Sequence, residues 1–251
     1  MQTDYLVIIP ARYASSRFPG KPLVDIGGKP MIRRVYEQAS KSVDNVYVAT
    51  DDERILQAVN NFRGKAVMTS PDHKSGTDRC AEAVKLIEEK TGKKFKIIIN
   101  VQGDEPFLQP EQLETIKSCF IKPDTEIATL VKPVTDAEII FDENKTKVIV
   151  NNKKEAVYFS RSPVPFIKNQ PQEKWVDSHR FYLHIGLYAY RKETLSSITK
   201  LNPSALEIAE SLEQLRWIEN GYKIKVEFTE HDSLGIDTPE DLANIEKMGL
   251  I

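Results

Sequence analysis

The stretch IIPARYASSRFPGKPL, residues 8–23, joins the end of an apolar run to a loop rich in positive charge and proline. Residues 5–9 predict a short buried strand, and Arg12, Arg17 and Lys21 follow it within one loop, where Gly20 allows the backbone close to a ligand. Ligands of an open parallel sheet bind beyond the carboxyl ends of its strands, where this loop begins. The loop therefore predicts a local anion site, although it lacks the GxxxxGK[ST] frame of a P-loop. A basic surface loop held by ion pairs is the alternative interpretation.

The first half of the chain alternates strand patterns with helix patterns. The expected elements are strands at 5–9, in NVYVAT (45–50), at 66–68 and in FKIIINV (95–101), with helices over 31–42, after Asp51 or Asp52, and up to about residue 91. The continuous apolar run of FKIIINV is typical of a strand that is covered on both faces. This alternation predicts an α/β fold with a mainly parallel sheet flanked by helices.

The pattern changes after Pro123. Strands are expected in EIATLVKPV (126–134), TKVIVNN (146–152), EAVYFS (155–160) and YLHIGLYAYRK (182–192), with NNKKEA (151–156) as a hairpin. A long amphipathic helix over 205–219, a strand over 223–228 and a final helix complete the chain. The sequence predicts one α/β domain with a strand-rich extension at about residues 125–190.

Composition limits the functional classes. A net charge of −2 over 251 residues argues against a general nucleic-acid or acidic-membrane binder. The two cysteines, Cys80 and Cys119, have no metal-binding spacing and suit a reducing compartment. The sequence shows neither a signal peptide nor an apolar run of membrane-spanning length, so we expect a cytoplasmic protein.

Two acidic motifs suggest a metal. NVQGDEP (100–106) places Asp104 and Glu105 directly after the most apolar strand, where a carboxylate could hold Mg²⁺ on a nucleotide's phosphates. Glu105 fits equally well as part of an acidic helix entry. In GIDTPEDL (235–242), Asp237 is expected to follow a short strand. It could supply a second metal carboxylate, or Asp237 or Thr238 could cap the last helix. The sequence leaves these alternatives open.

A series of blocks together resembles the 3-deoxy-manno-octulosonate (Kdo) cytidylyltransferase family, the CMP-Kdo synthetases. The blocks lie in the family's order from residue 7 to about 242, and HIGLYAYR with ESLEQLR distinguishes this family from the broader nucleotidyltransferases. Ser162 and Phe166 depart from the family pattern, where a small apolar residue and a tryptophan are expected. The blocks are IIPARYASSRFPGKPL, VATDDERI, SGTDR, NVQGDEP, YFSRSPVPF, HIGLYAYR, AESLEQLRW and GIDTPEDL.

The resemblance implies a Rossmann-like fold of the nucleotide-diphospho-sugar transferase type, with a strand-rich dimerisation extension. It implies a reaction of CTP with Kdo, dependent on Mg²⁺, that gives CMP-Kdo and pyrophosphate for lipopolysaccharide biosynthesis. The protein is then expected to be a cytoplasmic homodimer with no nucleic-acid or membrane partner.

The resemblance also assigns roles to single residues. Those expected to carry catalysis are Arg12, Arg17, Lys21 and Asp104, with Asp104 and Asp237 as metal ligands. Those expected to bind the nucleotide are Ala11, Arg12, Lys21, Ser75, Thr77, Arg79 and Gln102. Those expected to bind the sugar are Arg161, His184, Tyr188, Glu213 and Gln214. For Ser75 the alternative is a helix N-cap, which is compatible with the nucleotide role. Without the resemblance, His184 would be a packed core residue and Glu213 a charge on a solvated face.

Two other functions stay open. The first is activation of a related sugar acid. A sialic-acid type is opposed by the PARYASSRFPGKPL block. The sugar 8-amino-Kdo is harder to exclude, because it differs from Kdo at one substituent far from the reacting centre. The second is a non-catalytic nucleotide-binding relative, which the presence of both Asp104 and Asp237 opposes. The sequence assigns no role to His73, His179 or His231.

Overall fold

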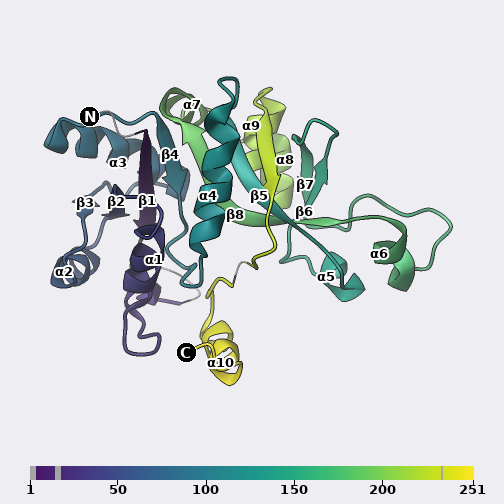
Figure 1. Ribbon diagram of the computed structural model, residues 1–251, viewed down its shortest axis with the longest axis horizontal. Coiled ribbons are helices and arrows are strands. Elements are labelled where there is room, and N and C mark those ends of the chain that lie inside the picture. Colours follow the sequence, from purple (N-terminus) through teal and green to yellow (C-terminus); the bar gives the residue numbers. More distant parts are fainter. Residues whose placement is uncertain (1–3, 15–17, 233) are drawn as a thin grey trace. The chain divides into compact units, whose positions relative to one another are not determined.

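The computed structural model describes residues 4–14, 18–232 and 234–251 and divides the chain into two compact units (Figure 1). The first unit contains the described residues up to 114 and those from 234 onward, and the second contains residues 115–232. In sequence the second unit is therefore an insertion into the first. The boundary between residues 114 and 115 falls within helix α4 (Pro110–Ser118). Within the described part of the chain, no helix has both the length and the apolar character needed to cross a membrane.

The first unit is built on a parallel sheet with the strand order β3-β2-β1-β4. Residues 6–9 of the first strand are all fully buried, so both faces of the sheet are covered, as the unbroken apolar run predicts. The helices α1, α2 and α3 form the connections between successive strands. The bounds are β1 (Tyr5–Ala11), η1 (Lys21–Leu23), α1 (Met31–Ala39), β2 (Val46–Thr50), α2 (Glu53–Asn61), β3 (Ala66–Met68), α3 (Gly76–Thr91) and β4 (Ile97–Asn100).

The C-terminal segment completes the core of the first unit. Helix α10 (Pro239–Lys247) begins at a capping box in which Thr238 accepts from the backbone N–H of Asp241 and Asp241 accepts from that of Thr238. Ile236 and Ile245 pack in one buried cluster with residues Ile26 and Met31. The last residues of the chain thus support the loop that follows the first strand.

The second unit contains an antiparallel pair of long strands, β5 and β8, with β9 parallel to β5 on its other side. The expected hairpin forms between β6 and β7, and β6 also pairs with β8. The bounds are η2 (Cys119–Ile121), β5 (Ile127–Pro133), α5 (Ala137–Phe141), β6 (Lys147–Val150), β7 (Ala156–Ser160), η3 (Gln172–Lys174), α6 (Trp175–Ser178), β8 (Tyr182–Arg191), α7 (Lys192–Ile198), α8 (Ala205–Glu210), α9 (Gln214–Glu219) and β9 (Ile224–Phe228).

Two predicted elements are wrong. The single helix expected over 205–219 is two helices, because Ser211 adopts the left-handed conformation with φ 52°. Arg216 of α9 binds the Glu207 carboxylate of α8 with its Nε at 2.7 Å, which holds the two short helices together. The strand expected just before Asp237 is also absent from the described residues: Ile236 donates its N–H to the Asp104 carbonyl, and the neighbouring residues have no strand conformation.

Candidate active site

A pocket of the first unit lies where the loops after β1 and β4 meet the loop before α3. The structure places around it most of the residues predicted to bind nucleotide and metal. Thr77 is buried just behind its wall, and Arg17 lies outside the described residues. The lining residues are Pro10, Ala11, Arg12, Lys21, Pro22, His73, Lys74, Ser75, Gly76, Arg79, Gln102, Gly103, Asp104 and Asp237.

Two glycines allow the loops to come this close. A Cβ on Gly103 would lie 2.8 Å from the carbonyl oxygen of Pro10, closer than van der Waals contact permits. Gly20 has φ +75°, in the left-handed region, and precedes the short helix η1 that begins with Lys21. The turn at Gly20 therefore directs the loop after β1 so that Lys21 begins a helical turn beside the pocket.

Lys21 lies between two carboxylates. Its Nζ is 2.6 Å from Oδ2 of Asp104 and 2.9 Å from Oδ1 of Asp237. Burial by itself lowers the pKa of Lys21, but the charges and hydrogen bonds of Asp104 and Asp237 outweigh burial and raise it above its ordinary value. Lys21 is therefore a permanent positive charge on the floor of the pocket.

Asp237 reaches this position because another residue caps the last helix. Thr238 is the N-cap of α10, and the backbone N–H groups of both Asp237 and Thr238 donate to Oδ2 of Asp241 at 2.9 Å. The N–H of Ile236 donates to the carbonyl of Asp104, which ties the segment before Asp237 to the loop after β4. Of the two alternatives for the helix cap, the structure selects Thr238.

The Asp104 and Asp237 carboxylates fit a Mg²⁺ site. Because both bind the same ammonium group, their oxygens converge on one small region of the pocket. Mg²⁺ takes one or two protein carboxylates and completes its octahedron with water and phosphate oxygens. One positive charge from Lys21 and two negative charges leave this cluster at −1, so an added triphosphate would require further positive charge.

The wall made by the start of α3 has small side chains. Ser75 is the N-cap of this helix and accepts from the backbone N–H of Asp78 at 3.1 Å, as the sequence allows. A Cβ added to Gly76 would lie 3.1 Å from Pro10, so the helix start and the end of β1 are in close contact. Gln102 donates to Oδ1 of Asn100 at 3.2 Å and lines the same wall. Ser75 and Gly76 therefore leave this wall without bulky side chains.

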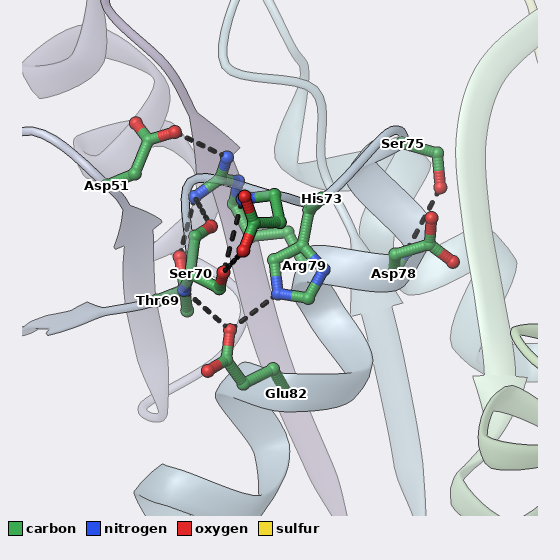
Figure 2. A network of polar contacts seen from close by, with 9 residues as sticks. Asp51, Thr69, Ser70, His73, Ser75, Asp78, Arg79 and Glu82 are labelled. Atoms are coloured by element: carbon green, nitrogen blue, oxygen red, sulfur yellow. Dashed lines mark hydrogen bonds and ion pairs between the residues drawn. The ribbon is translucent and has the colours of Figure 1, made fainter.

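Arg79 lines the pocket with little of its side chain exposed, and it binds other parts of the first unit (Figure 2). Its side chain is 4% exposed, with Nη2 2.8 Å from Oδ2 of Asp51 and Nη1 2.6 Å from Oγ1 of Thr69. Asp51 is available for this ion pair because Asp52 caps α2. The structure thus gives Arg79 a defined task in holding the loop before α3, and its predicted contact with the nucleotide stays a prediction.

The structure places at this site two residues to which sequence reasoning assigned no role. His73 and Lys74 line the pocket, and His73 binds Glu82 on α3. Glu82 is three residues after Arg79, which places both on the same side of a helix. That spacing was the available signal, but it does not say what the two residues bind.

In the second unit, Arg161 is fixed by backbone carbonyls. Its Nε donates to the carbonyl of Glu210 at 2.7 Å and its Nη1 donates to that of Glu143 at 2.9 Å. The N–H of Arg161 donates to the Glu210 carboxylate, which also accepts from Ser160. The carbonyl of Arg161 accepts from Lys147, a fully buried lysine. The Arg161 side chain is therefore held in place while part of its surface stays exposed.

His184 and Tyr188 lie together on β8. Their ring centroids are 5.1 Å apart, and the Nε2 atom of His184 is 3.1 Å from Oγ1 of Thr129. Burial lowers the pKa of His184 to about 3, so the ring is neutral at physiological pH. Burial, and then the charge of Glu213, raises the pKa of Tyr188 well above its ordinary value. Gln214, the next residue after Glu213, is buried at the start of α9.

The comparisons with known proteins agree with this geometry. Residues 6–224 match the family model described as Cytidylyltransferase. A relative from Parabacteroides distasonis, named 3-deoxy-manno-octulosonate cytidylyltransferase, is 57% identical over 242 residues, which cover 95% of each chain. A relative of the same name from Bacteroides thetaiotaomicron is 57% identical over 246 residues and 97% of each chain.

A solved structure supports the same conclusion. It is described as CMP:2-keto-3-deoxy-manno-octonic acid synthetase complexed with CTP, and it is 42% identical, with a TM-score of 0.88 and 99% of both chains covered. A glucose-1-phosphate thymidylyltransferase from Bacillus anthracis, described as putative, shares the fold alone, at 18% identity and a TM-score of 0.60 over 97% of this chain and 94% of its own. The predicted α/β fold class is confirmed, and the chain belongs to the 3-deoxy-manno-octulosonate cytidylyltransferase family.

Proposed function

We propose that this protein transfers the cytidylyl group of CTP to Kdo, which gives CMP-Kdo and pyrophosphate for lipopolysaccharide biosynthesis. The observation that carries the proposal is the placement of Lys21 between Asp104 and Asp237 in a pocket that Arg12 and Ser75 also line. Relatives named for this activity align over nearly the whole chain.

The proposed chemistry is a displacement at the α-phosphorus. The anomeric hydroxyl of the sugar forms the new oxygen–phosphorus bond, loses its proton, and pyrophosphate leaves with the electrons of the broken bond. Such reactions depend on alignment and on neutralising charge more than on a protein nucleophile. Lys21 and Arg12 would contact the phosphates and stabilise the charge that develops on the leaving pyrophosphate.

We propose that Mg²⁺ binds with CTP and that Asp104 and Asp237 hold it. When bound, the ion would neutralise phosphate charge. The cluster of Lys21, Asp104 and Asp237 has a net charge of −1, so it cannot neutralise a triphosphate by itself. The role of this chain's own residues is to place the two carboxylates, through the Gly103 turn and the capping box at Thr238, at the point where the phosphates lie.

We propose that the second unit binds the sugar acid through Arg161, His184, Tyr188, Glu213 and Gln214. A guanidinium has five N–H groups, and the carbonyls of Glu210, Glu143 and, at 3.5 Å, Ser211 accept from three of them. The remaining N–H groups can donate to a carboxylate. Neutral His184 and the adjacent Tyr188 supply polar groups suited to sugar hydroxyls.

The test is pyrophosphate release by the purified protein with Mg²⁺, across CTP, UTP, ATP and GTP combined with Kdo, 8-amino-Kdo and a sialic acid. We expect release with CTP and Kdo at the highest kcat/KM. A preference for 8-amino-Kdo or sialic acid would change the sugar, and no release with any pair would refute the enzymatic proposal.

We further propose a cytoplasmic homodimer. Both cysteines are buried thiols, which suits a reducing compartment. The extension at about 125–190 exposes apolar side chains that a partner could cover: Phe166 is 74% exposed beside Trp175, and Val157 is 49% exposed on β7. Light scattering at micromolar concentration should give twice the 28.6 kDa chain mass, and a strictly monomeric mass would contradict the dimer.

A further inference from the structure

His73 lines the proposed nucleotide pocket, and its ring is bound by the carboxylate of Glu82. The Nε2 atom is 2.5 Å from Oε2 of Glu82, and the same oxygen accepts from the backbone N–H of Ser70 at 2.8 Å. Glu82 comes from α3, whose first residues form the pocket wall. Figure 2 shows the second ring nitrogen of His73 on the side away from Glu82.

The contact with Glu82 determines where the proton of a neutral His73 ring lies. Burial by itself raises the pKa of Glu82, but hydrogen bonds from His73 and from the Ser70 N–H outweigh it and lower the pKa, so Glu82 is an ionised group that only accepts. Nε2 must therefore carry a hydrogen. In the neutral ring, Nδ1 is then an acceptor with a free lone pair.

The loop that carries His73 is held by side chains of α3 on two sides without any ligand. Arg79 holds one end of it through Thr69 and the Ser70 carbonyl, and is itself held by Asp51. Glu82, one helical turn further along α3, holds the loop through Ser70 and His73 (Figure 2). A side chain fixed in this way loses little conformational entropy when a ligand binds.

We infer that His73 binds the nucleoside part of the nucleotide, with Nδ1 accepting a hydrogen bond from a donor group, and that Glu82 is the residue that positions it. Phosphate oxygens are acceptors and offer nothing to the Nδ1 lone pair of a neutral ring, whereas a doubly protonated ring would donate to phosphate and its loss would weaken all four nucleotides equally. The donor is therefore a ribose hydroxyl or the amino group of cytosine, both of which share this chemistry. The inference rests on the proposed binding of CTP in this pocket.

The experiment measures dissociation constants by calorimetry, without sugar, for CTP, UTP, 2′-deoxy-CTP and 3′-deoxy-CTP. It compares the unmodified protein with His73→Phe, which keeps a ring of similar shape without the nitrogens. Loss of one hydrogen bond should weaken CTP binding by about five- to tenfold. The analogue that lacks the partner group should bind both proteins equally, and it thereby identifies the donor as the amino group, the 2′-hydroxyl or the 3′-hydroxyl.

Variants of Glu82 test the positioning role. Glu82→Ala should reproduce the same selective loss, whereas Glu82→Gln, whose amide oxygen still accepts from Nε2–H, should restore most of the CTP affinity. Glu89→Ala, at an exposed position of the same helix, is the matched control and should bind all four nucleotides normally.

Two results would overturn the inference: unchanged CTP affinity in His73→Phe, or an equal loss for all four nucleotides, which would indicate that the ring only supports the loop. A Glu82→Ala variant that weakens every nucleotide equally would overturn the positioning role of Glu82. These outcomes differ from failure of the proposed function, in which the unmodified protein itself would not bind CTP.

Discussion

The ammonium group of Lys21 lies 2.6 Å from the carboxylate of Asp104. Asp237, which comes much later in the chain, binds the same ammonium group. Lys21 thus holds together two carboxylates that would otherwise repel each other. A bound cation and a triphosphate would change the partners of all three groups. The cluster is therefore the place where single substitutions should affect the reaction most.

Asp104→Asn should nearly abolish turnover while the fold is preserved. The substitution keeps the size of the side chain but removes the charge, and loss of one such electrostatic group costs on the order of 10²–10³ in rate. Pyrophosphate release at saturating Mg²⁺ measures the effect, with circular dichroism as the check on folding. Asp44→Asn, at an exposed position of the same unit, is the control. Near-normal activity of Asp104→Asn would remove Asp104 from the reaction.

Lys21→Ala and Arg161→Ala should affect different substrates. Lys21 lies in the pocket proposed for the triphosphate, so its loss should weaken CTP binding and turnover together. Arg161→Ala should raise the KM for Kdo and leave CTP binding in the absence of sugar nearly unchanged, because a planar guanidinium can grip a carboxylate bidentately. Titration of CTP into each variant without sugar is decisive. An equal loss of CTP affinity in both would show that this division of roles is wrong.

Gly103→Ala should impair the nucleotide pocket. The added Cβ would lie 2.8 Å from the Pro10 carbonyl, so the end of β1 and the loop after β4 must move apart. Displacements of about 1 Å can cost up to about 10²-fold in rate, and we expect CTP affinity to fall by at least about tenfold. Gly186→Ala is the matched control, because its Cβ would meet no atom within 4 Å. Equal CTP affinity in both variants would contradict the close approach of the end of β1 to the loop after β4.

Stability should fall in mild acid because of His184. Its folded pKa of about 3 is below the value of about 6.5 in the unfolded chain, so between these values only the unfolded state takes up the proton. This contribution is fully present at pH 7 and decreases as the pH falls below about 6.5. Between pH 7 and pH 5, protonation of His184 in the unfolded chain should lower the free energy of unfolding by about 2 kcal/mol.

Urea denaturation at pH 7 and at pH 5 tests this. His184→Gln should lose less stability between the two pH values than the unmodified protein does. His179→Gln, at an exposed histidine of the same unit, should behave like the unmodified protein. The same pH dependence in all three proteins would show that His184 does not titrate in this way.

Hydrophobic periodicity predicts most strands and helices because burial and period are directly linked. The helix break at Ser211 could not be predicted, because it depends on tertiary contacts. Arg161, which is distant in sequence, binds Glu210, and Arg216 of the next helix binds Glu207. Serine is also not a residue that ordinarily marks a left-handed turn.

For the site, sequence predicts the residue types at the carboxyl ends of β1 and β4 but not their pairing. Whether Asp51 or Asp52 caps α2, and whether Asp237 or Thr238 caps α10, decides which carboxylate is available to a cation. Each pair is equivalent by local rules, and only tertiary contacts with Arg79 and Lys21 separate the two members. The role of Glu82 was hidden for the same reason.

The late position of Asp237 in the chain has a consequence for biosynthesis. Translation produces Lys21 and Asp104 early, then the entire second unit, and only afterwards Ile236, Asp237 and α10. A nascent chain that stops at residue 232 therefore lacks one of the two carboxylates that bind Lys21 and two members of the cluster around Ile26 and Met31. The lining of the pocket and the cluster beneath its first loop can therefore be completed only after the whole inserted unit has been synthesised.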